Sequence, residues 1–325
     1  MPESDGNHLM RPLLLLALAV LTGPACSGEP QSESAASAPT ERIELPARPE
    51  NTHAYAAETL SRFRDLIQGE DWRAPAWNAQ GTLEVTHVPT GLTLLLVPGG
   101  SFHMGSRTGP DDERPRHRVA TPAFLLSKTE CPQAGWDRVG GEDSRWFKGA
   151  DLPIESVSWI AAREWCERVG LRLPSESEWE FACRAGSVAA WCFGDDASRL
   201  REYGWYFVNS GKGLLPLDTK LDARKLTGEW GCATRPVGGL KPNAFGLHDM
   251  HGNVWEWCED TYHGSFLGAP SDGSARVADG TVDRVIRGGA WGHPARWSRS
   301  AKRGKALPGL RWSVLGFRPA RSLPE

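Results

Sequence analysis

Two carboxylates and two tight backbone positions occur together in residues 246–260, which read GLHDMHGNVWEWCED. Asp249 and Glu256 can supply carboxylate oxygens, and the backbone at Gly252 and Val254 can turn its carbonyl groups inward. Hard oxygen ligands of this kind are those that Ca²⁺ prefers. The alternative is a buried aromatic strand with a solvated glutamate, because acidic turns are common on protein surfaces.

The tryptophans of the same stretch predict a β-strand. Successive side chains of a strand point to opposite faces of the sheet. This alternation places Trp255 and Trp257 on one face and Val254, Glu256 and Cys258 on the other. The Glu256 carboxylate is therefore expected on the face opposite the two indoles.

Two helices that must support this strand have clear signals. The first has an apolar face and ends at a glycine; its marker residues are Trp159, Ala162, Cys166, Val169 and Gly170. The second begins at Ser175, where Glu178 completes a capping box, and it ends at Gly186. Trp179 and Cys183 lie four residues apart on its core face.

Composition predicts an α+β fold with a high coil content, short strands and few helices. The 325 residues include 15 Trp and 36 Gly but only 4 Tyr, a bias typical of a loop-rich fold whose core is built from indoles. The net charge of −3 and the absence of a basic patch argue against nucleic-acid binding. P-loop and GxSxG motifs are also absent from the sequence.

The N-terminus resembles an export signal. An apolar run of nine residues, 13–21, is too short to span a bilayer but suits a signal peptide, with translation starting at Met10. Small residues precede Cys26, as in a bacterial lipoprotein, so residues 1–25 are the expected signal peptide and Cys26 the lipidated residue. The alternative is ordinary secretion. We expect a protein of the bacterial cell envelope, either an outer-membrane lipoprotein or periplasmic.

The rest of the chain divides into three parts. Residues 26–50 are rich in Ser, Ala, Pro and Glu and predict a disordered tether. Residues 51–81 are a helical lead-in, and residues 82–325 form the main domain. Six cysteines remain after Cys26, which permits three disulfides of undetermined pairing in an oxidising compartment: Cys131, Cys166, Cys183, Cys192, Cys232 and Cys258.

Several motifs in order resemble the sulfatase-modifying-factor family, which includes the formylglycine-generating enzyme. Besides residues 246–257 and Glu130, they are LVPGGSFHMGS (96–106), DERPRHRV (112–119), PIESVSW (153–159), LRLPSESEWEFAC (171–183), PVG (236–238), RGGAW (287–291) and GFR (316–318). The resemblance implies the formylglycine-generating-enzyme version of a C-type-lectin-like fold over about residues 90–322.

The resemblance also implies structural calcium. It assigns side-chain oxygens to Asp249 and Glu256 and backbone oxygens to Gly252 and Val254. A weaker second calcium site would use Asn209, Ser210 and Glu229.

The copper centre of the formylglycine-generating enzymes is where this sequence departs from the family. That centre uses two cysteines, because soft thiolate ligands select Cu(I). His293 and Ser298 stand at the two positions, and no cysteine follows Cys258. Copper is therefore not expected. The resemblance also implies that Cys166 and Cys183 lack the disulfide partners found in the animal enzymes, so they pair elsewhere or stay free.

We expect a monomeric, non-oxidase binding or accessory module, anchored to the membrane through lipid. Its ligand would be a peptide, a protein or a small molecule of the envelope, held in a groove lined by Trp291, Arg296 and Trp297. The alternative is a divergent oxidoreductase of the formylglycine-generating or siderophore-maturation type. The sequence does not identify the ligand.

Overall fold

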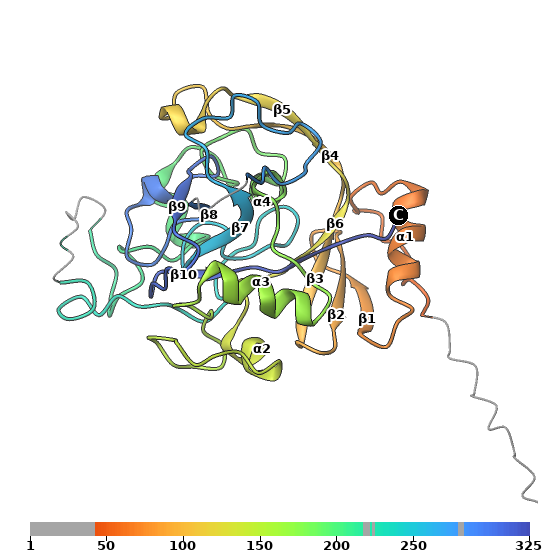
Figure 1. The fold of residues 1–325 in the computed structure, drawn as a ribbon, viewed down its shortest axis with the longest axis horizontal. Helices are drawn as coiled ribbons and strands as arrows, with labels where there is room; N and C mark the ends of the chain where they lie inside the picture. Colours follow the sequence, from red (N-terminus) through yellow and green to blue (C-terminus); the bar gives the residue numbers. More distant parts are fainter. Residues whose placement is uncertain (1–42, 217–221, 223–224, 279–282) are drawn as a thin grey trace, which may run out of the picture. The chain divides into compact units, whose positions relative to one another are not determined.

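A computed structural model describes residues 43–216, 222, 225–278 and 283–325 (Figure 1). Residues 42–325 group into one compact unit. The expected signal peptide, the lipidation site Cys26 and most of the tether lie outside the described residues. In the described part of the chain, no helix is both long and apolar enough to cross a bilayer.

An antiparallel five-stranded sheet draws on both ends of this unit. Its strands, in spatial order, are β1 (Trp72–Trp77), β2 (Leu83–His87), β3 (Leu92–Val97), β6 (Phe124–Ser127) and β11 (Ala320–Ser322). Strand β11 pairs with β6, so the end of the chain lies beside strands from its first half (Figure 1).

The predicted lead-in, residues 51–81, is an integral part of the same unit. Helix α1 (Ala57–Leu66) forms part of this lead-in, and its Phe63 and the following Ile67 are fully buried in the main core. Strand β1 is hydrogen-bonded to β2. The lead-in is therefore joined directly to the main domain.

A second sheet carries the tryptophan-rich stretch. Its strands, in spatial order, are β10 (Leu315–Phe317), β7 (Trp255–Thr261), β8 (Arg284–Arg287) and β9 (Gly304–Ala306). β10 runs parallel to β7, while β8 is antiparallel to both β7 and β9. The predicted alternation is confirmed: Trp255 and Trp257 join one buried cluster and Cys258 joins another, so both faces of β7 are covered.

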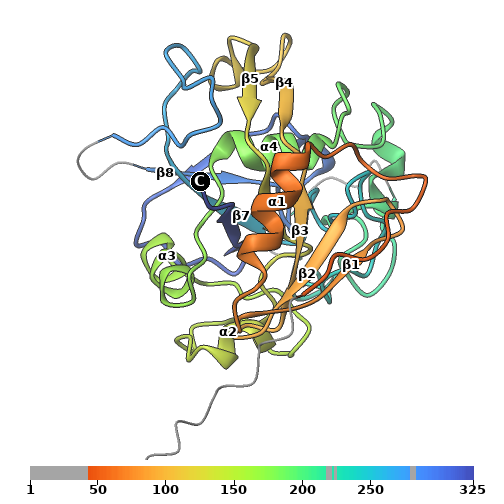
Figure 2. The ribbon, with the colours of Figure 1, turned by 90° about the vertical axis from the view of Figure 1, so that its right-hand side faces the viewer.

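The remaining elements are short. Strands β4 (Gly100–Met104) and β5 (His117–Thr121) form a hairpin that extends upward in Figure 2. The helices are α2 (Gln133–Arg138), α3 (Trp159–Arg168) and α4 (Glu176–Arg184), with 3₁₀ turns η1 (Asp111–Glu113), η2 (Ala197–Glu202) and η3 (Ala295–Ser298). The capping box of Ser175 and Glu178 is present as predicted, and α4 ends at Ala185, which has a φ of +44°.

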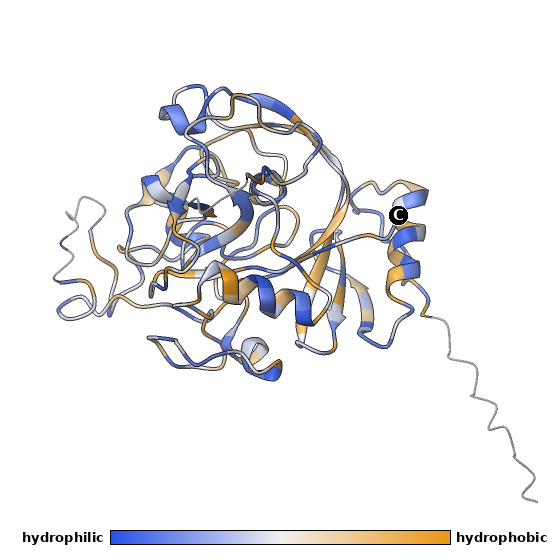
Figure 3. Ribbon diagram, in the orientation of Figure 1, coloured by the Kyte–Doolittle hydropathy of each residue, from blue (hydrophilic) through white to orange (hydrophobic). Residues whose placement is uncertain are grey.

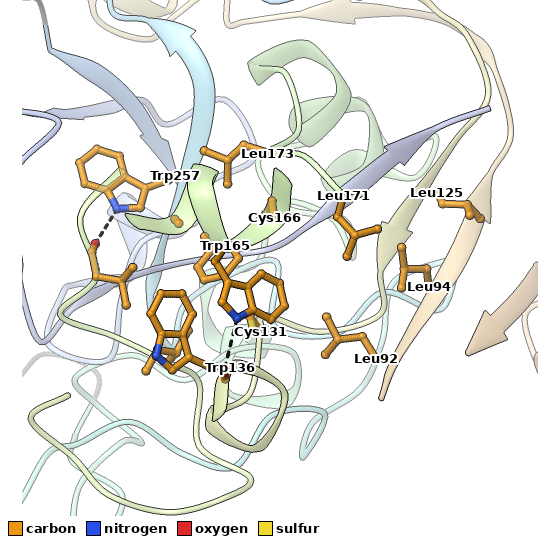
Figure 4. Close-up of a cluster of buried hydrophobic side chains, with 14 of the residues drawn as sticks. Leu92, Leu94, Leu125, Cys131, Trp136, Trp165, Cys166, Leu171, Leu173 and Trp257 are labelled. Carbon is orange, nitrogen blue, oxygen red and sulfur yellow. Dashed lines mark hydrogen bonds between the residues drawn. The ribbon is translucent and has the colours of Figure 1, made fainter. Parts of the chain in front are cut away.

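Indole rings organise the core, as the composition predicted. Trp136 and Trp165 stack with ring centroids 5.8 Å apart, and Phe317 packs edge-on against both. The Trp165 and Trp257 indole nitrogens donate to backbone carbonyls, at 3.2 and 2.8 Å (Figure 4). Apolar strands such as β3 and β6 line the same interior (Figure 3). Trp136, Trp165 and Trp257 thus bury large rings while their N–H groups donate hydrogen bonds.

All six cysteines that follow Cys26 are free thiols, and five of them are buried. The disulfides that an oxidising compartment would permit are therefore not part of this structure. Packing and buried polar contacts must hold the fold together in their place.

Trp165→Ala should lower the free energy of unfolding by about 3–5 kcal/mol, because it removes a fully buried ring from the stack. Trp146→Ala is the matched control: that side chain is 72% exposed, so the change should stay within about 0.5 kcal/mol. Urea unfolding followed by circular dichroism measures both. Equal losses of the free energy of unfolding in the two variants would contradict the assignment of the Trp136–Trp165 stack to the core.

Candidate functional site

The turn before β7 has a constrained backbone. Asp249 and Asn253 have φ angles of +59° and +58°, and Gly252 has a φ of +138°. A Cβ atom at position 252 would lie 2.2 Å from the carbonyl oxygen of Trp205, so only glycine fits. The Asn253 N–H donates to the same carbonyl at 2.7 Å, which docks the turn on Trp205.

A buried ion pair lies beside this turn. Arg318 binds Glu256 through two nitrogens, at 2.7 and 3.0 Å, and neither side chain is exposed to solvent. The Trp179 indole donates to Glu256 at 2.7 Å. Arg318 also donates to the carbonyls of Ser127 and His248, both at 2.9 Å. Both oxygens of Glu256 are therefore engaged.

Two further carboxylates face the same guanidinium. Glu130 accepts hydrogen bonds from the Asn253 amide at 2.9 Å and the Val254 N–H at 3.0 Å. One oxygen of Asp249 accepts the Gly238 N–H at 2.6 Å. The other oxygen, Oδ1, is buried and has no hydrogen-bond partner in the structure.

The cluster carries excess negative charge. Burial, with the charges of Asp249 and Glu256, raises the pKa of Glu130 well above its ordinary value. Burial and the charge of Glu256 raise the pKa of Asp249 to about 6, although Arg318 and the Gly238 hydrogen bond oppose the shift. Three carboxylates thus share one arginine, and the imbalance favours uptake of either a proton or a metal cation.

The predicted calcium ligands fit a cation in part. Asp249 Oδ1 is a buried carboxylate oxygen that nothing else engages, and a positive charge beside it would offset the carboxylate excess. Glu256 could contribute only an oxygen that it shares with Arg318 or Trp179. In the described residues, no group of three His, Cys, Asp or Glu side chains is arranged to hold a metal. Any calcium here would depend on backbone carbonyls.

The three residues of the weaker second site are engaged separately. The Asn209 side-chain oxygen accepts the Tyr206 N–H at 2.8 Å. The Ser210 carbonyl accepts two hydrogen bonds from Arg235, at 2.6 and 2.9 Å. Glu229 is exposed and pairs with Lys225. The Arg235 guanidinium therefore already engages the Ser210 carbonyl oxygen.

His293 and Ser298 face different surroundings. The Trp255 indole donates to His293 Nδ1 at 3.1 Å, and the imidazole stacks on Trp297 with centroids 4.6 Å apart. Burial lowers the pKa of His293 to about 4, so the ring is neutral near pH 7. Ser298 is fully buried, and a Cβ atom placed on Gly289 would lie 2.5 Å from its hydroxyl oxygen.

Comparison with known proteins decides the family. Residues 80–323 match the family described as "Sulfatase-modifying factor enzyme 1-like domain", which is more than half of the chain. This protein belongs to the sulfatase-modifying-factor family. The expected α+β fold of the formylglycine-generating-enzyme type is confirmed.

Individual family relatives differ in length. The formylglycine-generating enzyme of Mus musculus is 33% identical over 197 residues, which cover 58% of this chain and 49% of that enzyme. "Serine/threonine-protein kinase pkn1" of Chlamydia pneumoniae is 31% identical over 260 residues, 71% of this chain and 38% of the kinase. This chain therefore spans less than half of either protein. The structure of PvdO from Pseudomonas aeruginosa has 30% identity and a TM-score of 0.58, covering 72% of this chain and 95% of PvdO.

The expected ligand groove of this family member needs correction at one residue. Trp291 does not line a groove: it is 3% exposed, donates to the Ser313 carbonyl at 2.9 Å and packs edge-on against Phe147. Arg296 and Trp297 are exposed and line a cavity of 440 Å³ beside η3.

Three residues of the candidate site have no local signal in the sequence. Glu130 and Arg318 belong to the motifs that carry the family resemblance, but sequence spacing does not place them beside the Asp249 turn. Arg235 lies outside those motifs. A buried Glu256 requires a cation, and the arginine of GFR was a visible candidate.

Asp249→Asn should change how stability depends on pH. Because the pKa of Asp249 is about 6 in the folded state and 3.8 ordinarily, protonation of Asp249 stabilises the fold below about pH 4. This contribution to the free energy of unfolding is lost as the pH rises through 6. Asparagine keeps an oxygen for Gly238 but does not titrate. In calcium-free buffer, the free energy of unfolding of the variant should therefore rise relative to that of the wild type by about 3 kcal/mol between pH 4 and pH 7. Urea unfolding at several pH values tests this, and parallel pH profiles would contradict it.

Proposed function

We propose that this protein is an exported, lipid-anchored sulfatase-modifying-factor domain that binds a ligand or assists another envelope protein without copper-dependent oxidation. This proposal rests on the groups that His293 and Ser298 could offer to a metal ion. An indole N–H can only donate, so His293 Nδ1 must be the acceptor and the ring proton must lie on Nε2. The neutral imidazole then has no lone pair free for a metal.

The second position is no better suited. The Ser298 hydroxyl is a hard, neutral oxygen, whereas Cu(I) selects soft sulfur ligands. Its burial against Gly289 also separates it from the exposed surface on which Trp297 lies. The residues present do not fit a copper centre.

The thiols of the described chain do not replace the missing pair. Burial raises the pKa of all six, and that of Cys192 reaches about 12. A thiolate, rather than a thiol, is the metal ligand and the nucleophile. Cys183 approaches His251, but that imidazole is neutral and uses Nδ1 and Nε2 for hydrogen bonds to backbone groups. Neither residue is therefore poised for redox chemistry.

The purified full chain should not take up Cu(I) at His293 or convert a Cys-x-Pro-x-Arg peptide to formylglycine. A competition titration against a chromophoric Cu(I) chelator and mass spectrometry of the peptide measure the two outcomes. His293→Ala serves as the matched control and should behave like the wild type. Stoichiometric copper in the wild type that is lost in His293→Ala, together with peptide turnover, would overturn the proposal.

A divergent oxidoreductase is the second candidate. It is favoured by the 33% identity to a formylglycine-generating enzyme across 58% of this chain. The peptide assay above separates the two candidates, because turnover supports the oxidoreductase and its absence supports the binding module.

We also propose that Ca²⁺ binds at Asp249, with carbonyl oxygens of Gly252 and Val254. The unengaged Oδ1 and the carboxylate excess support this site. Calcium at one hundred times its dissociation constant should stabilise the wild type at pH 7.5 by about 2.7 kcal/mol. Asp249→Asn should lose this effect, and Mg²⁺ should not reproduce it. A wild type whose thermal unfolding does not respond to calcium would refute the site.

A further inference from the structure

A cavity of 510 Å³ opens between the loop that follows β4, the end of α4 and the segment around residue 299. Its volume lies within the range of small-molecule sites. Four arginines line it: Arg107, Arg116, Arg184 and Arg299. The cavity shares Thr108 and Arg299 with the 440 Å³ cavity at Arg296 and Trp297.

Two of these arginines are already neutralised. Arg184 pairs with Glu180 at 2.8 Å and donates to the carbonyls of Gly105 and Ala189. Arg299 binds Glu113 through two nitrogens, at 2.7 and 3.0 Å. The charges of Arg184 and Arg299 are already used in ion pairs within the protein, and the two side chains form part of the cavity wall.

The other two arginines are not in direct contact with a carboxylate of the described chain. Within the described part of the chain, neither Arg107 nor Arg116 makes an ion pair or a side-chain hydrogen bond. Burial, Arg107 and Arg184 lower the pKa of Arg116, and the charge of Glu180 only partly opposes them. The one carboxylate on the lining, Asp195, is exposed and accepts the Ala190 N–H at 2.8 Å.

We propose that Arg107 and Arg116 bind the oxyanion of a small phosphate or sulfate ester in this cavity. Guanidinium groups match such oxygens with paired, charge-assisted hydrogen bonds. A free phosphate or sulfate ion is much smaller than 510 Å³, so the remainder of the cavity accommodates the organic part of the ester. Asp195 can accept a hydrogen bond from a hydroxyl or amine of that part.

This inference rests on the proposed binding function, since it names the class of ligand. It does not depend on the copper question. If the anion titration showed no binding, the argument against copper at His293 and Ser298 would still stand. If the peptide assay showed turnover, the proposed oxyanion site in the arginine cavity would still stand.

Calorimetric titration of the full chain tests the proposal, with inorganic phosphate, inorganic sulfate, phenyl phosphate and phenyl sulfate at constant ionic strength. We expect saturable binding to one site, tighter for an ester than for its free anion. Comparison of the phosphate and sulfate series identifies the preferred oxyanion. Tighter binding of the free anions would overturn the ester assignment.

The Arg107→Ala/Arg116→Ala variant should weaken binding at least tenfold without changing the melting temperature, because neither side chain has an ion partner to lose. Arg118→Ala is the matched control: that arginine is exposed on β5, contacts Ser101 and does not line the cavity. Its affinity should equal that of the wild type. Absence of saturable binding in the wild type, or equal affinity in the double variant, would overturn the proposal.

A second measurement does not require substitutions. Phenylglyoxal modifies accessible arginines, and peptide mass spectrometry locates the modified sites. Phenyl phosphate should protect Arg107 and Arg116 and leave Arg118 reactive. Equal protection of all three, or of none, would contradict a specific site.

Discussion

The fold depends on one buried charge, the Arg318 guanidinium. Arg318 lies in the link between β10 of the second sheet and β11 of the first. It binds Glu256 on β7, donates to the carbonyl of Ser127 at the end of β6, and reaches the turn through His248. Through Glu256 it is also coupled to Trp179 of α4. A single side chain therefore ties two sheets, one helix and the Asp249 turn together. Removal of this arginine would leave three carboxylates buried without a cation, which is far more costly than the loss of one hydrogen bond.

A second network of the same kind surrounds α4. Glu176 binds Arg303 through two nitrogens, at 2.6 and 2.8 Å, and lies 3.3 Å from Arg287. Glu180 pairs with Arg287 at 2.5 Å and with Arg184. The carboxylates of Glu176 and Glu180 are therefore buried and matched by arginines, of which Arg287 and Arg303 come from distant segments. Such contacts are directional, and they fix the geometry of a loop-rich chain whose six thiols form no disulfides.

The sequence predicted the local elements well because their signals are local. The alternation of β7, the capping box at Ser175 and the indole core all follow from neighbouring residue types, and all are present. The pairing of β1 with β2 links the predicted lead-in to the main domain, and composition alone does not predict such a pairing.

The candidate site was only partly predictable, because its partners come from distant parts of the chain. Glu130 and Arg318 lie more than 60 residues from the turn that they contact, and no spacing rule links them to it. Trp291 was misplaced for a related reason. An indole next to two glycines suits a groove as well as a core, and only its contacts with Phe147 and Ser313 place it inside.

Two further arginines, Arg235 and Arg303, also make directed contacts with distant segments. Arg235 holds the Ser210 carbonyl at the weaker calcium position. Arg303 likewise holds the Glu176 carboxylate. A guanidinium supplies positive charge and several directed hydrogen bonds without metal or oxidation. Arg107 and Arg116 are different, since they have no such structural partner, and the charge that they place on a cavity wall is available to a ligand.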